Sequence, residues 1–252
     1  MSDEMVKIRN LHKSFDDLVV LNGISLNVEY GQNMIVFGRS GTGKSVLLKC
    51  LIRLIEPDAG EIFIRDKDVL SLNREELNDL RKDIGFLFQS SALYDSMSVR
   101  ENLEFPLIRN FDFDKSEIDS RVHKVLEAVD LIEAIDKMPA ELSGGMRKRV
   151  GLARSIITEP KLMLYDEPTT GLDPITSKEI STLILSLQKA FNMTSIVVTH
   201  DLLCAKIIAD CAIVLKDGHI IKEGTIKQLL ADEDPFLKDF FSDEVINKNG
   251  RD

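Results

Sequence analysis

The distribution of apolar and polar residues predicts strands at the start of the chain. Residues 6–11 and 19–28 are rich in apolar and β-branched side chains, which are typical of strands. Residues 33–37 (NMIVF) form a short apolar run that ends in a glycine-rich turn, and residues 44–54 then follow a helical pattern. This part of the chain therefore predicts a strand, a loop and a helix in direct succession.

The next segment predicts two further strands and then a group of helices. Short apolar runs at 62–65 and 84–88 suit strands, and between them Asn73 and Glu76 have the spacing of a capping box at a helix start. A later stretch has apolar residues at helical spacing, which marks an amphipathic helix. These residues are Ile118, Val122, Val125, Leu126 and Val129.

The middle of the chain is interpreted as a helical insertion, at residues 95–158. A second helix is expected there, after Ser143 and up to residue 157. Buried strands return at 162–165 and 195–198. The pattern predicts a single α/β core with a helical subdomain inserted into it.

The last part of the chain predicts a helix around 180–187 and then a hairpin. Apolar runs at 211–215 and 219–221 flank Asp217 and Gly218, and this dipeptide is a strong signal for a two-residue hairpin turn. The tail that follows is polar, apart from one apolar cluster. The cluster consists of Phe236, Leu237, Phe240 and Phe241.

These patterns set the expected domain boundaries. We expect one domain at 1–224, with the helical subdomain inserted at about 95–158, and a C-terminal helical extension at 225–252. The apolar cluster of the extension is expected to dock on its own subunit, or to contact a second subunit or a small regulatory partner.

Composition places the chain among ordinary globular proteins and excludes one class of partner. The chain has 252 residues, of which 44% are hydrophobic and 29% charged, and its formal net charge is −10. An extended nucleic-acid groove needs dense Lys and Arg to displace counterions, so no nucleic-acid partner is expected. A local basic site for a small anion is still compatible with this net charge.

The cysteines and the first residues exclude several other classes. Cys50, Cys204 and Cys211 are widely spaced and form no CxxC pair, so neither a zinc site nor a disulfide framework is expected. Reduced thiols of a cytosolic protein are the simplest interpretation. Residues Met1 to Glu4 lack the apolar core of a signal peptide, and no run of roughly 18 apolar residues is present. Any membrane role is therefore expected to come through a partner.

The glycine-rich turn after the third strand matches a phosphate-binding motif in full. Residues 38–45 read GRSGTGKS, which fits G-x-x-x-x-G-K-[ST]. Glycines let successive N–H groups point at phosphate oxygens, and the following helix adds its positive end to the same anion site. Lys44 supplies a mobile positive charge for the β- and γ-phosphates, and the Ser45 hydroxyl is suited to ligate Mg²⁺. The motif alone leaves many families of NTPases open.

A pair of carboxylates follows the strand expected at 162–165. Asp166 and Glu167 come directly after this apolar run, and a carboxylate at such a strand end lies beside the phosphate loop. We assign Asp166 to the metal ion and Glu167 to polarising the attacking water. Adjacent side chains at the end of a strand point in different directions, so the two can take separate roles.

Between these motifs the chain resembles the signature of ABC ATPases. Residues 142–146 read LSGGM, where ABC ATPases usually have LSGGQ. The resemblance implies that Ser143, Gly144 and Gly145 cap the ATP held by the opposite subunit, through a hydroxyl, backbone N–H groups and a helix N-terminus. Met146 lacks the amide donor and acceptor of glutamine. Because the serine and both glycines are retained, hydrolysis is expected to survive this change.

Other positions match the same family one by one. Gln89 follows an expected strand and resembles the Q-loop glutamine, which contacts Mg²⁺ or water and links the site to a transmembrane partner. The tripeptide Gly171-Leu172-Asp173 resembles the D-loop, which lies across the dimer interface. His200 also follows an expected strand and resembles the switch histidine that contacts the γ-phosphate. Phe15 is similar to the A-loop aromatic residue that stacks on adenine.

The resemblance covers almost the whole chain, from about Val6 to Gly224. It implies an α/β fold, a P-loop NTPase core of the ABC-ATPase type with an N-terminal antiparallel β subdomain and an inserted α-helical subdomain. It also implies an ATPase with catalytic residues Glu167, His200 and Gln89, and with metal ligands Ser45, Gln89 and Asp166. The ATP-binding residues that it implies are Phe15, Gly38, Arg39, Ser40, Gly41, Thr42, Gly43, Lys44, Ser45, Val46, Ser143, Gly144 and Gly145.

Three stretches resemble one branch of the family. They are GRSGTGKSVLLK at 38–49, QSSALYDSMSV at 89–99 and the signature with Met146, and they are similar to the ATPases of MCE-associated, Mla-type lipid transporters of Gram-negative envelopes. This implies a homodimer that binds two MgATP at the cytoplasmic face of the inner membrane. The implied partners are an integral membrane permease, a periplasmic MCE-domain protein and a small cytoplasmic regulatory subunit. The expected substrate is phospholipid or another hydrophobic molecule.

Three other assignments are compatible with the motifs. A soluble ABC ATPase of DNA repair or chromosome maintenance usually has coiled coils, zinc hooks or two cassettes, none of which this sequence contains. A scaffold ATPase of cluster assembly resembles a transporter cassette without a permease, and the presence of Glu167 and His200 weighs mildly against it. An importer of amino acids or metals has the same motifs, since the ATPase itself does not touch the transported substrate.

Overall fold

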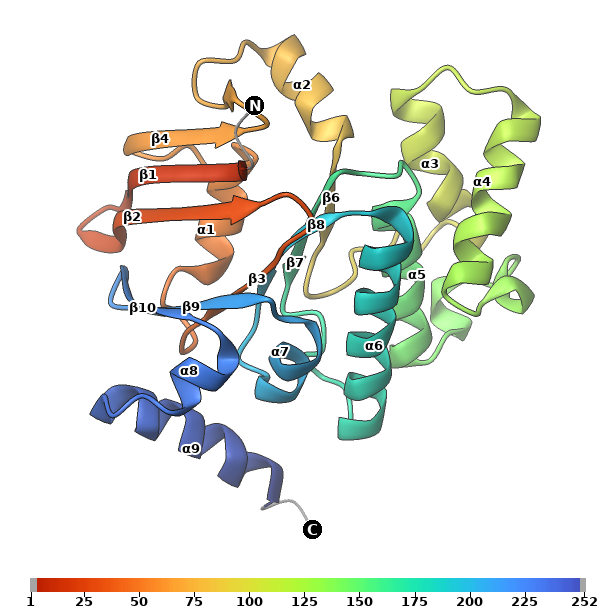
Figure 1. The fold of residues 1–252 in the computed structure, drawn as a ribbon. Helices are drawn as coiled ribbons and strands as arrows, with labels where there is room; N and C mark the ends of the chain where they lie inside the picture. Colours follow the sequence, from red (N-terminus) through yellow and green to blue (C-terminus); the bar gives the residue numbers. More distant parts are fainter. Residues whose placement is uncertain (1–3, 250–252) are drawn as a thin grey trace.

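The computed structural model describes residues 4–249, which form two sheets and the helices that cover them (Figure 1). Residues 1–3 and 250–252, which the expected boundaries 1–224 and 225–252 include, lie outside the described residues. The predicted α/β architecture, with an N-terminal antiparallel sheet and a helical subdomain inserted in the core, is confirmed.

The N-terminal sheet has four strands in the order β2-β1-β4-β5, and all of its pairs are antiparallel. Its strands are β1 (Glu4–Phe15), β2 (Leu18–Glu29), β4 (Ala59–Ile64) and β5 (Lys67–Asp68). Buried and exposed residues alternate along the second half of β2, as expected for a sheet with one face on a core.

The second sheet has six strands in the order β10-β9-β3-β8-β7-β6. Its strands are β3 (Asn33–Phe37), β6 (Ile84–Leu87), β7 (Leu162–Asp166), β8 (Thr194–Val198), β9 (Cys211–Lys216) and β10 (His219–Gly224). All pairs are parallel except the hairpin of β9 and β10. Every residue of β3, β7 and β8 is buried, which explains their continuous apolar runs. The loops after these three strands therefore meet at one edge of the sheet.

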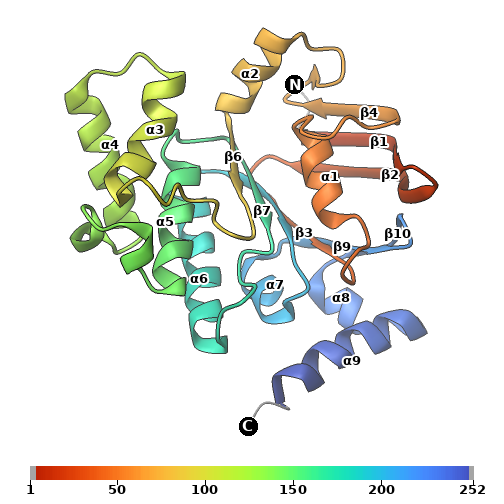
Figure 2. The same cartoon turned by 180° about the vertical axis from the view of Figure 1, so that it is seen from behind.

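Different layers cover the two faces of the six-stranded sheet, as Figures 1 and 2 show from opposite sides. Met34 and Leu164 pack in one core with α1, α2 and the antiparallel sheet, whereas Ile35 and Tyr165 pack in a second core with the later helices. The helices are α1 (Lys44–Leu51), α2 (Arg74–Lys82), α3 (Val99–Asn110), α4 (Lys115–Ala128), α5 (Gly144–Ile156), α6 (Pro174–Phe191), α7 (Leu202–Ile208), α8 (Ile226–Leu230) and α9 (Pro235–Asn249), with two 3₁₀ turns at Ile132–Ala134 and Pro139–Glu141. Within residues 4–249, no helix combines the length and the apolar character needed to cross a lipid bilayer.

Side-chain caps fix the starts of several helices. The predicted capping box of Asn73 and Glu76 is present at the start of α2. Ser98 and Glu101 form a second box at the start of α3, which opens the inserted helical subdomain between β6 and β7. The Ser143 hydroxyl accepts from the Met146 N–H and caps α5, so the helix expected after Ser143 begins at the predicted place.

The first helix is shorter than the sequence pattern predicts. The prediction of a helix over 44–54 is wrong at its end, since α1 stops at Leu51. Arg53 has a φ of +50°, which an α-helix does not contain. Its guanidinium donates to the carbonyls of Val69 and Leu72, at 3.1 and 2.8 Å. These bonds to a distant segment hold the chain off the helical path.

The C-terminal part of the chain packs against the parallel sheet. Asp217 and Gly218 both have positive φ, of 48° and 76°, so they form the two-residue turn that the sequence predicts between β9 and β10. Phe240 and Phe241 of α9 pack edge-on against Phe37 at the end of β3, with ring centroids 6.0 and 5.4 Å apart. The apolar cluster of the tail thus docks on its own chain.

Candidate nucleotide site

The phosphate loop lies between β3 and α1, and its own residues shape it. Gly43 has a φ of +94°, and a Cβ atom there would lie 2.8 Å from the Val20 carbonyl oxygen, so the position requires glycine. The Lys44 ammonium donates to the carbonyls of Gly38 and Arg39, at 2.7 and 3.1 Å. Lys44 is thereby held over the loop, where a phosphate group would meet it.

The end of β7 brings two carboxylates to the same edge. The Ser45 hydroxyl, on the first turn of α1, donates to Asp166 Oδ1 at 2.7 Å. The next residue, Glu167, has a φ of +50°, and its N–H donates to the Val198 carbonyl at 2.9 Å. Because the backbone turns here, the carboxylates of Asp166 and Glu167 contact different partners.

The Glu167 carboxylate lies at the centre of a set of polar contacts. His200 Nδ1 is 2.9 Å from Oε2, and the Thr170 hydroxyl donates to the same oxygen at 3.2 Å. The Lys44 ammonium is 3.6 Å from Oε1. Burial alone raises the pKa of Glu167, but the hydrogen bond and charge of His200, together with the charge of Lys44, bring this pKa below its ordinary value. The carboxylate is therefore ionised at neutral pH.

The donor atoms at this edge fit a metal–phosphate ligand. The Ser45 hydroxyl and the Asp166 carboxylate are hard oxygen donors only 2.7 Å apart, which suits Mg²⁺. The Lys44 ammonium and the curled backbone of the loop suit the phosphates that such an ion would accompany. Val46 follows on α1 and is half-buried at its first turn.

Gln89 lies in the loop after β6. It is exposed, and its backbone carbonyl accepts a hydrogen bond from the Lys148 ammonium of α5. Lys148 itself is buried. Burial lowers the pKa of this lysine, while the carboxylates of Glu167 and Asp166 oppose that shift. A lysine of the signature helix thus bonds the backbone at Gln89.

The signature residues lie away from the phosphate loop of their own chain. Gly145 packs against Thr176, whose Cγ2 would be 3.0 Å from an added Cβ atom, and Gly144 lies against Leu172. Helix α5 packs in the core on one face of the six-stranded sheet, whereas α1 packs on the other face. Ser143 is exposed at the start of α5. The structure therefore does not bring Ser143, Gly144 and Gly145 to the Lys44 ammonium.

Two further expected residues lie at exposed turns. Phe15 ends β1, is 43% exposed, and has the Lys13 ammonium 5.3 Å from its ring centroid. The Phe15 side chain is thus partly exposed, with a cation close to its ring. Asp173 caps α6 by accepting from the N–H groups of Ile175 and Thr176, so the D-loop runs directly into that helix.

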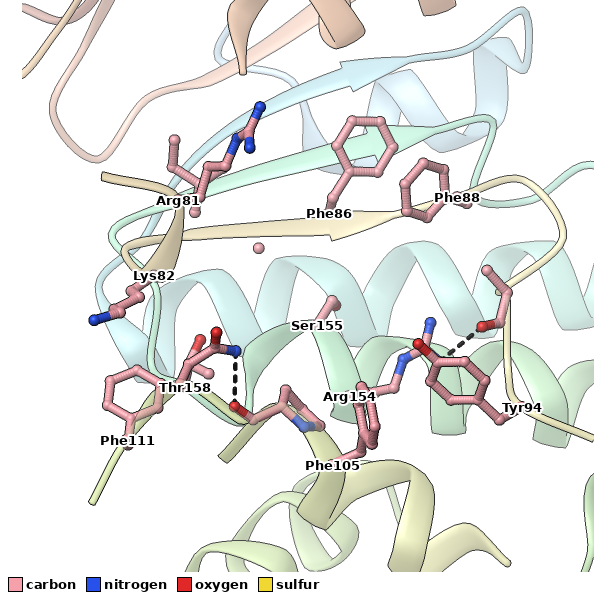
Figure 3. Close-up of a pocket in the computed structure, with 15 residues that line it drawn as sticks. Arg81, Lys82, Phe86, Phe88, Tyr94, Phe105, Phe111, Arg154, Ser155 and Thr158 are labelled. Atoms are coloured by element: carbon pink, nitrogen blue, oxygen red, sulfur yellow. Dashed lines mark hydrogen bonds between the residues drawn. The ribbon is translucent and has the colours of Figure 1, made fainter. Parts of the chain in front are cut away.

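A groove opens beside Gln89, between the parallel sheet and the helical subdomain (Figure 3). Its volume is about 510 Å³. Phe86 and Phe88 line it from the β6 side, and Tyr94 and Phe105 line it from the loop and α3, as Figure 3 shows. Arg154 of α5 lies at the same end as Tyr94. The mixture of aromatic and cationic side chains suits an amphipathic helix of a partner.

The ABC transporter family model matches residues 21–170, a span that includes the phosphate loop, Gln89, the signature and both carboxylates. The chain belongs to the ABC transporter family. The chain is also 39% identical to the intermembrane phospholipid transport system ATP-binding protein MlaF of Haemophilus influenzae, over 97% of this chain and 92% of MlaF. The predicted resemblance to an Mla-type ATPase is confirmed.

Other comparisons support the same family. The methionine import ATP-binding protein MetN of Rhizobium johnstonii is 38% identical over 91% of this ABC transporter chain and 63% of MetN. The ATP-binding cassette MJ0796, in a dimeric post-hydrolysis state bound to ADP and Pi, superposes with a TM-score of 0.80 at 33% identity, covering 88% of this chain and 99% of that one. This ABC transporter chain is therefore an ATP-hydrolysing enzyme that binds ATP.

Sequence reasoning missed several residues that shape the site of this ABC transporter chain. Thr170 bonds Glu167 from the turn after β7, and Lys148 and Arg154 contact the loop after β6. Asp239 of α9 pairs with Arg39 of the phosphate loop at 2.6 Å. Thr170 was detectable by its closeness to the carboxylates, but the other contacts join residues far apart in the chain and have no local signal.

Proposed function

We propose that this chain is the ATPase subunit of a transporter that moves phospholipid or another hydrophobic molecule between the membranes of a Gram-negative envelope. The observation that supports the ATPase chemistry best is the cluster of Lys44, Ser45, Asp166, Glu167 and His200 at one sheet edge. The similarity to MlaF over nearly the whole of both chains supports the lipid substrate.

Each residue of the cluster has a distinct proposed role in hydrolysis. Ser45, Asp166 and the Gln89 side chain would hold Mg²⁺, which neutralises charge on the β- and γ-phosphates when bound. Lys44 and the loop amides hold the phosphates. Glu167 orients the attacking water and accepts its proton, while His200 fixes the carboxylate and contacts the γ-phosphate. Positioning and charge stabilisation, rather than covalent chemistry, accelerate this reaction.

Two copies of the chain would complete each nucleotide site. Ser143, Gly144 and Gly145 lie at the exposed start of α5, where a helix N-terminus and a hydroxyl suit a phosphate held by a second chain. The similarity to the dimeric cassette MJ0796 supports this arrangement. Binding of two ATP would close the dimer, and hydrolysis would remove the charges that join its halves. Phe15 would stack on adenine.

The proposed partners follow from the groove and from the similarity to MlaF. A helix of an integral membrane permease would occupy the groove beside Gln89 and hold the chain at the cytoplasmic face of the inner membrane. We further propose a periplasmic MCE-domain protein and a small cytoplasmic regulatory subunit in the same assembly. The domain boundaries 1–224 and 225–252 remain our prediction for the catalytic unit and its extension.

An importer of a small polar molecule is the second candidate. The 38% identity to MetN, a methionine import ATP-binding protein, favours it specifically. The ATPase chemistry is the same in both cases, and only the membrane partners differ. The substrate therefore has to be tested on the assembly rather than on the nucleotide site.

The hydrolysis roles are tested by the substitution Glu167→Gln. We expect the rate of phosphate release to fall by roughly 100-fold or more, because the general base is lost, while binding of a fluorescent ATP analogue is retained. The matched control is Glu127→Gln, at an exposed position of α4. Phosphate release at the wild-type rate in Glu167→Gln would contradict the assignment.

The substrate is tested by affinity purification of the chain from detergent-solubilised membranes, with mass spectrometry of the proteins and lipids that accompany it. A permease, an MCE-domain protein and bound phospholipid would support lipid transport. A permease with a periplasmic solute-binding protein and no lipid would overturn that substrate and leave the ATPase assignment intact. Recovery without any membrane protein would overturn the transporter assembly.

A further inference from the structure

The loop after β6, residues 88–94, joins the proposed nucleotide site to the groove. Gln89 lies near its start, and Tyr94 at its end lines the groove. Between them, Ser91 and Ala92 have φ values of +62° and +45°, so two successive residues that are not glycine are left-handed. L-residues avoid this region because Cβ approaches the backbone, and such conformations persist only where their surroundings hold them.

Two cations of α5 bond the backbone of this loop. The Lys148 ammonium donates to the Gln89 carbonyl. The Arg154 guanidinium donates to the Ala92 carbonyl at 2.7 Å and to the Ser91 carbonyl at 3.1 Å. We call Lys148 and Arg154 the carbonyl clamp. The clamp thus bonds the two left-handed residues, Ser91 and Ala92. It also bonds Gln89, which we assign to the metal ion.

One face of α5 presents the clamp. Lys148, Gly151 and Arg154 follow one another at intervals of three, which places them on the same side of a helix. A Cβ atom at Gly151 would lie 2.8 Å from Ser91 Cβ, so the helix backbone approaches the loop closely at this glycine. This close contact brings both cations of the clamp within bonding distance of the loop carbonyls.

The clamp is also connected to the wall of the groove. The Arg154 guanidinium lies 5.7 Å from the centroid of the Tyr94 ring, and Figure 3 shows the two side chains together at one end of the groove. The Tyr94 ring in turn packs against Phe105 of α3, with centroids 5.0 Å apart. Asn102 of α3 bonds both the N–H and the carbonyl of Tyr94. Continuous contacts therefore lead from the groove wall through Arg154 to the loop.

We propose that Lys148 and Arg154 are positioning residues for ATP hydrolysis. By bonding the loop backbone at Gln89, Ser91 and Ala92, they present Gln89 to the nucleotide. The inference rests on the role proposed above for Gln89. It adds that the signature helix, and not the loop itself, sets the position of this glutamine.

The first test compares Arg154→Met and Lys148→Met in the full-length chain, purified with the membrane subunits that accompany it. We expect kcat to fall about tenfold in each, because Gln89 is displaced, with less than about a twofold change in KM for ATP. The matched control is Arg149→Met. Arg149 lies on the same helix and also donates to a backbone carbonyl, that of Val129 at 3.2 Å, but does not contact the loop.

A rescue experiment separates positioning from general stability. Adding Ala92→Gly to Arg154→Met should recover most of the lost kcat, since glycine adopts a positive φ without strain. Arg154→Lys should be intermediate, because lysine cannot bond two carbonyls with a planar fork. If Arg154→Met does not fold, Arg154→Lys with and without Ala92→Gly gives the same comparison.

The variant Gln89→Ala distinguishes the two proposals. A wild-type kcat in Gln89→Ala would overturn the role of Gln89, and the clamp with it. A slow Gln89→Ala enzyme beside an Arg154→Met enzyme of wild-type kcat would overturn the clamp alone. The clamp would also be overturned if kcat fell equally in Arg154→Met and Arg149→Met and Ala92→Gly did not restore it. Slow clamp variants that Ala92→Gly rescues would support it.

Discussion

The phosphate loop and the loop 88–94 border the same proposed nucleotide site, but they are held in different ways. In the phosphate loop the left-handed positions are glycines, Gly41 and Gly43, and the cation that bonds its carbonyls is its own Lys44. In loop 88–94 the left-handed positions are Ser91 and Ala92. The cations that bond its carbonyls come from α5, at 59 to 63 residues' separation.

This difference separates a self-contained loop from a dependent one. In the phosphate loop, glycines adopt the left-handed conformation without strain and the loop's own Lys44 bonds its carbonyls, so neither feature needs a side chain of the helical subdomain. The backbone of loop 88–94 is bonded instead by Lys148 and Arg154 of α5 and, at Tyr94, by Asn102 of α3. A dependent loop can respond to a movement of the helices, as a switch element between two sites must. The two loops thus suit binding and communication respectively.

The substitution Gly43→Ala breaks the self-contained loop and should have the largest effect. A left-handed alanine whose Cβ overlaps the Val20 carbonyl should lower the free energy of unfolding by about 3 kcal/mol and weaken ATP binding by about 100-fold. Urea unfolding and titration with a fluorescent ATP analogue measure the two effects. In the matched control Gly31→Ala, the position has a φ of +76° but no clash within 4 Å, so ATP binding should be unchanged. Equal ATP affinities in both variants would contradict this account.

The substitution Ser45→Ala removes one proposed metal ligand without disturbing either loop. We expect the Mg²⁺ concentration needed for half-maximal hydrolysis to rise about tenfold, because the hydroxyl beside Asp166 is lost. A Mg²⁺ titration of ATPase activity measures the shift. Ser186→Ala, at an exposed position of α6, is the control. An unchanged Mg²⁺ dependence would remove Ser45 from the metal site.

The substitution Ala92→Gly alone sharpens the comparison of the two loops. It places a glycine at a left-handed position of loop 88–94, as in the phosphate loop. Relief of the left-handed strain should exceed the extra entropy of the unfolded chain and stabilise the fold by about 0.5 kcal/mol. Ala190→Gly, at an exposed helical position of α6, should instead destabilise by about 0.5–1 kcal/mol. Urea unfolding of both variants measures the contrast. Destabilisation by both to the same extent would show that Ala92 is not strained.

The substitution Asp239→Asn tests the ion pair between α9 and Arg39 of the phosphate loop, and it should have the smallest effect. The pair is half-exposed, so its loss should change KM for ATP by about twofold. The difference from wild type should disappear in about 1 M salt, which screens the pair. Glu233→Gln breaks another ion pair of α9, that with Lys238, and should leave KM unchanged. A tenfold change in KM would show instead that α9 controls nucleotide binding.

The parts of the fold that sequence patterns predicted well are those with local signals. The buried strands are continuous apolar runs, and the turn at Asp217 and Gly218 needs only its own dipeptide. Helix α3 was harder to place, because its apolar residues do not gather on one side and it contains Pro106. The structure shows a capping box of Ser98 and Glu101 at its start, a local signal that the sequence analysis did not use. The end of α1 depended on bonds from Arg53 to another segment, which no local pattern encodes.

The residues of the candidate site also fall into two groups, those with a local sequence signal and those without one. The structure brings Lys44, Ser45, Asp166, Glu167 and His200 together as the motifs predicted, because parallel strands align their ends. The roles of Gln89, Phe15 and the signature residues in binding or catalysis stay predictions. The carbonyl clamp could not have been predicted, since two ordinary cations of a helix become informative only when their carbonyl partners are known.

The docking of α9 beside the phosphate loop matters for anyone who labels this protein. Two cations lie near the Phe236 ring, Arg39 of the phosphate loop at 5.5 Å and Lys216 at 4.4 Å from its centroid. A purification tag or fluorescent protein fused directly after α9 would pull on a helix that touches the phosphate loop. We expect such a fusion to change the nucleotide affinity without changing any motif. A tag placed before β1, with a flexible spacer, is the better choice for measuring this enzyme.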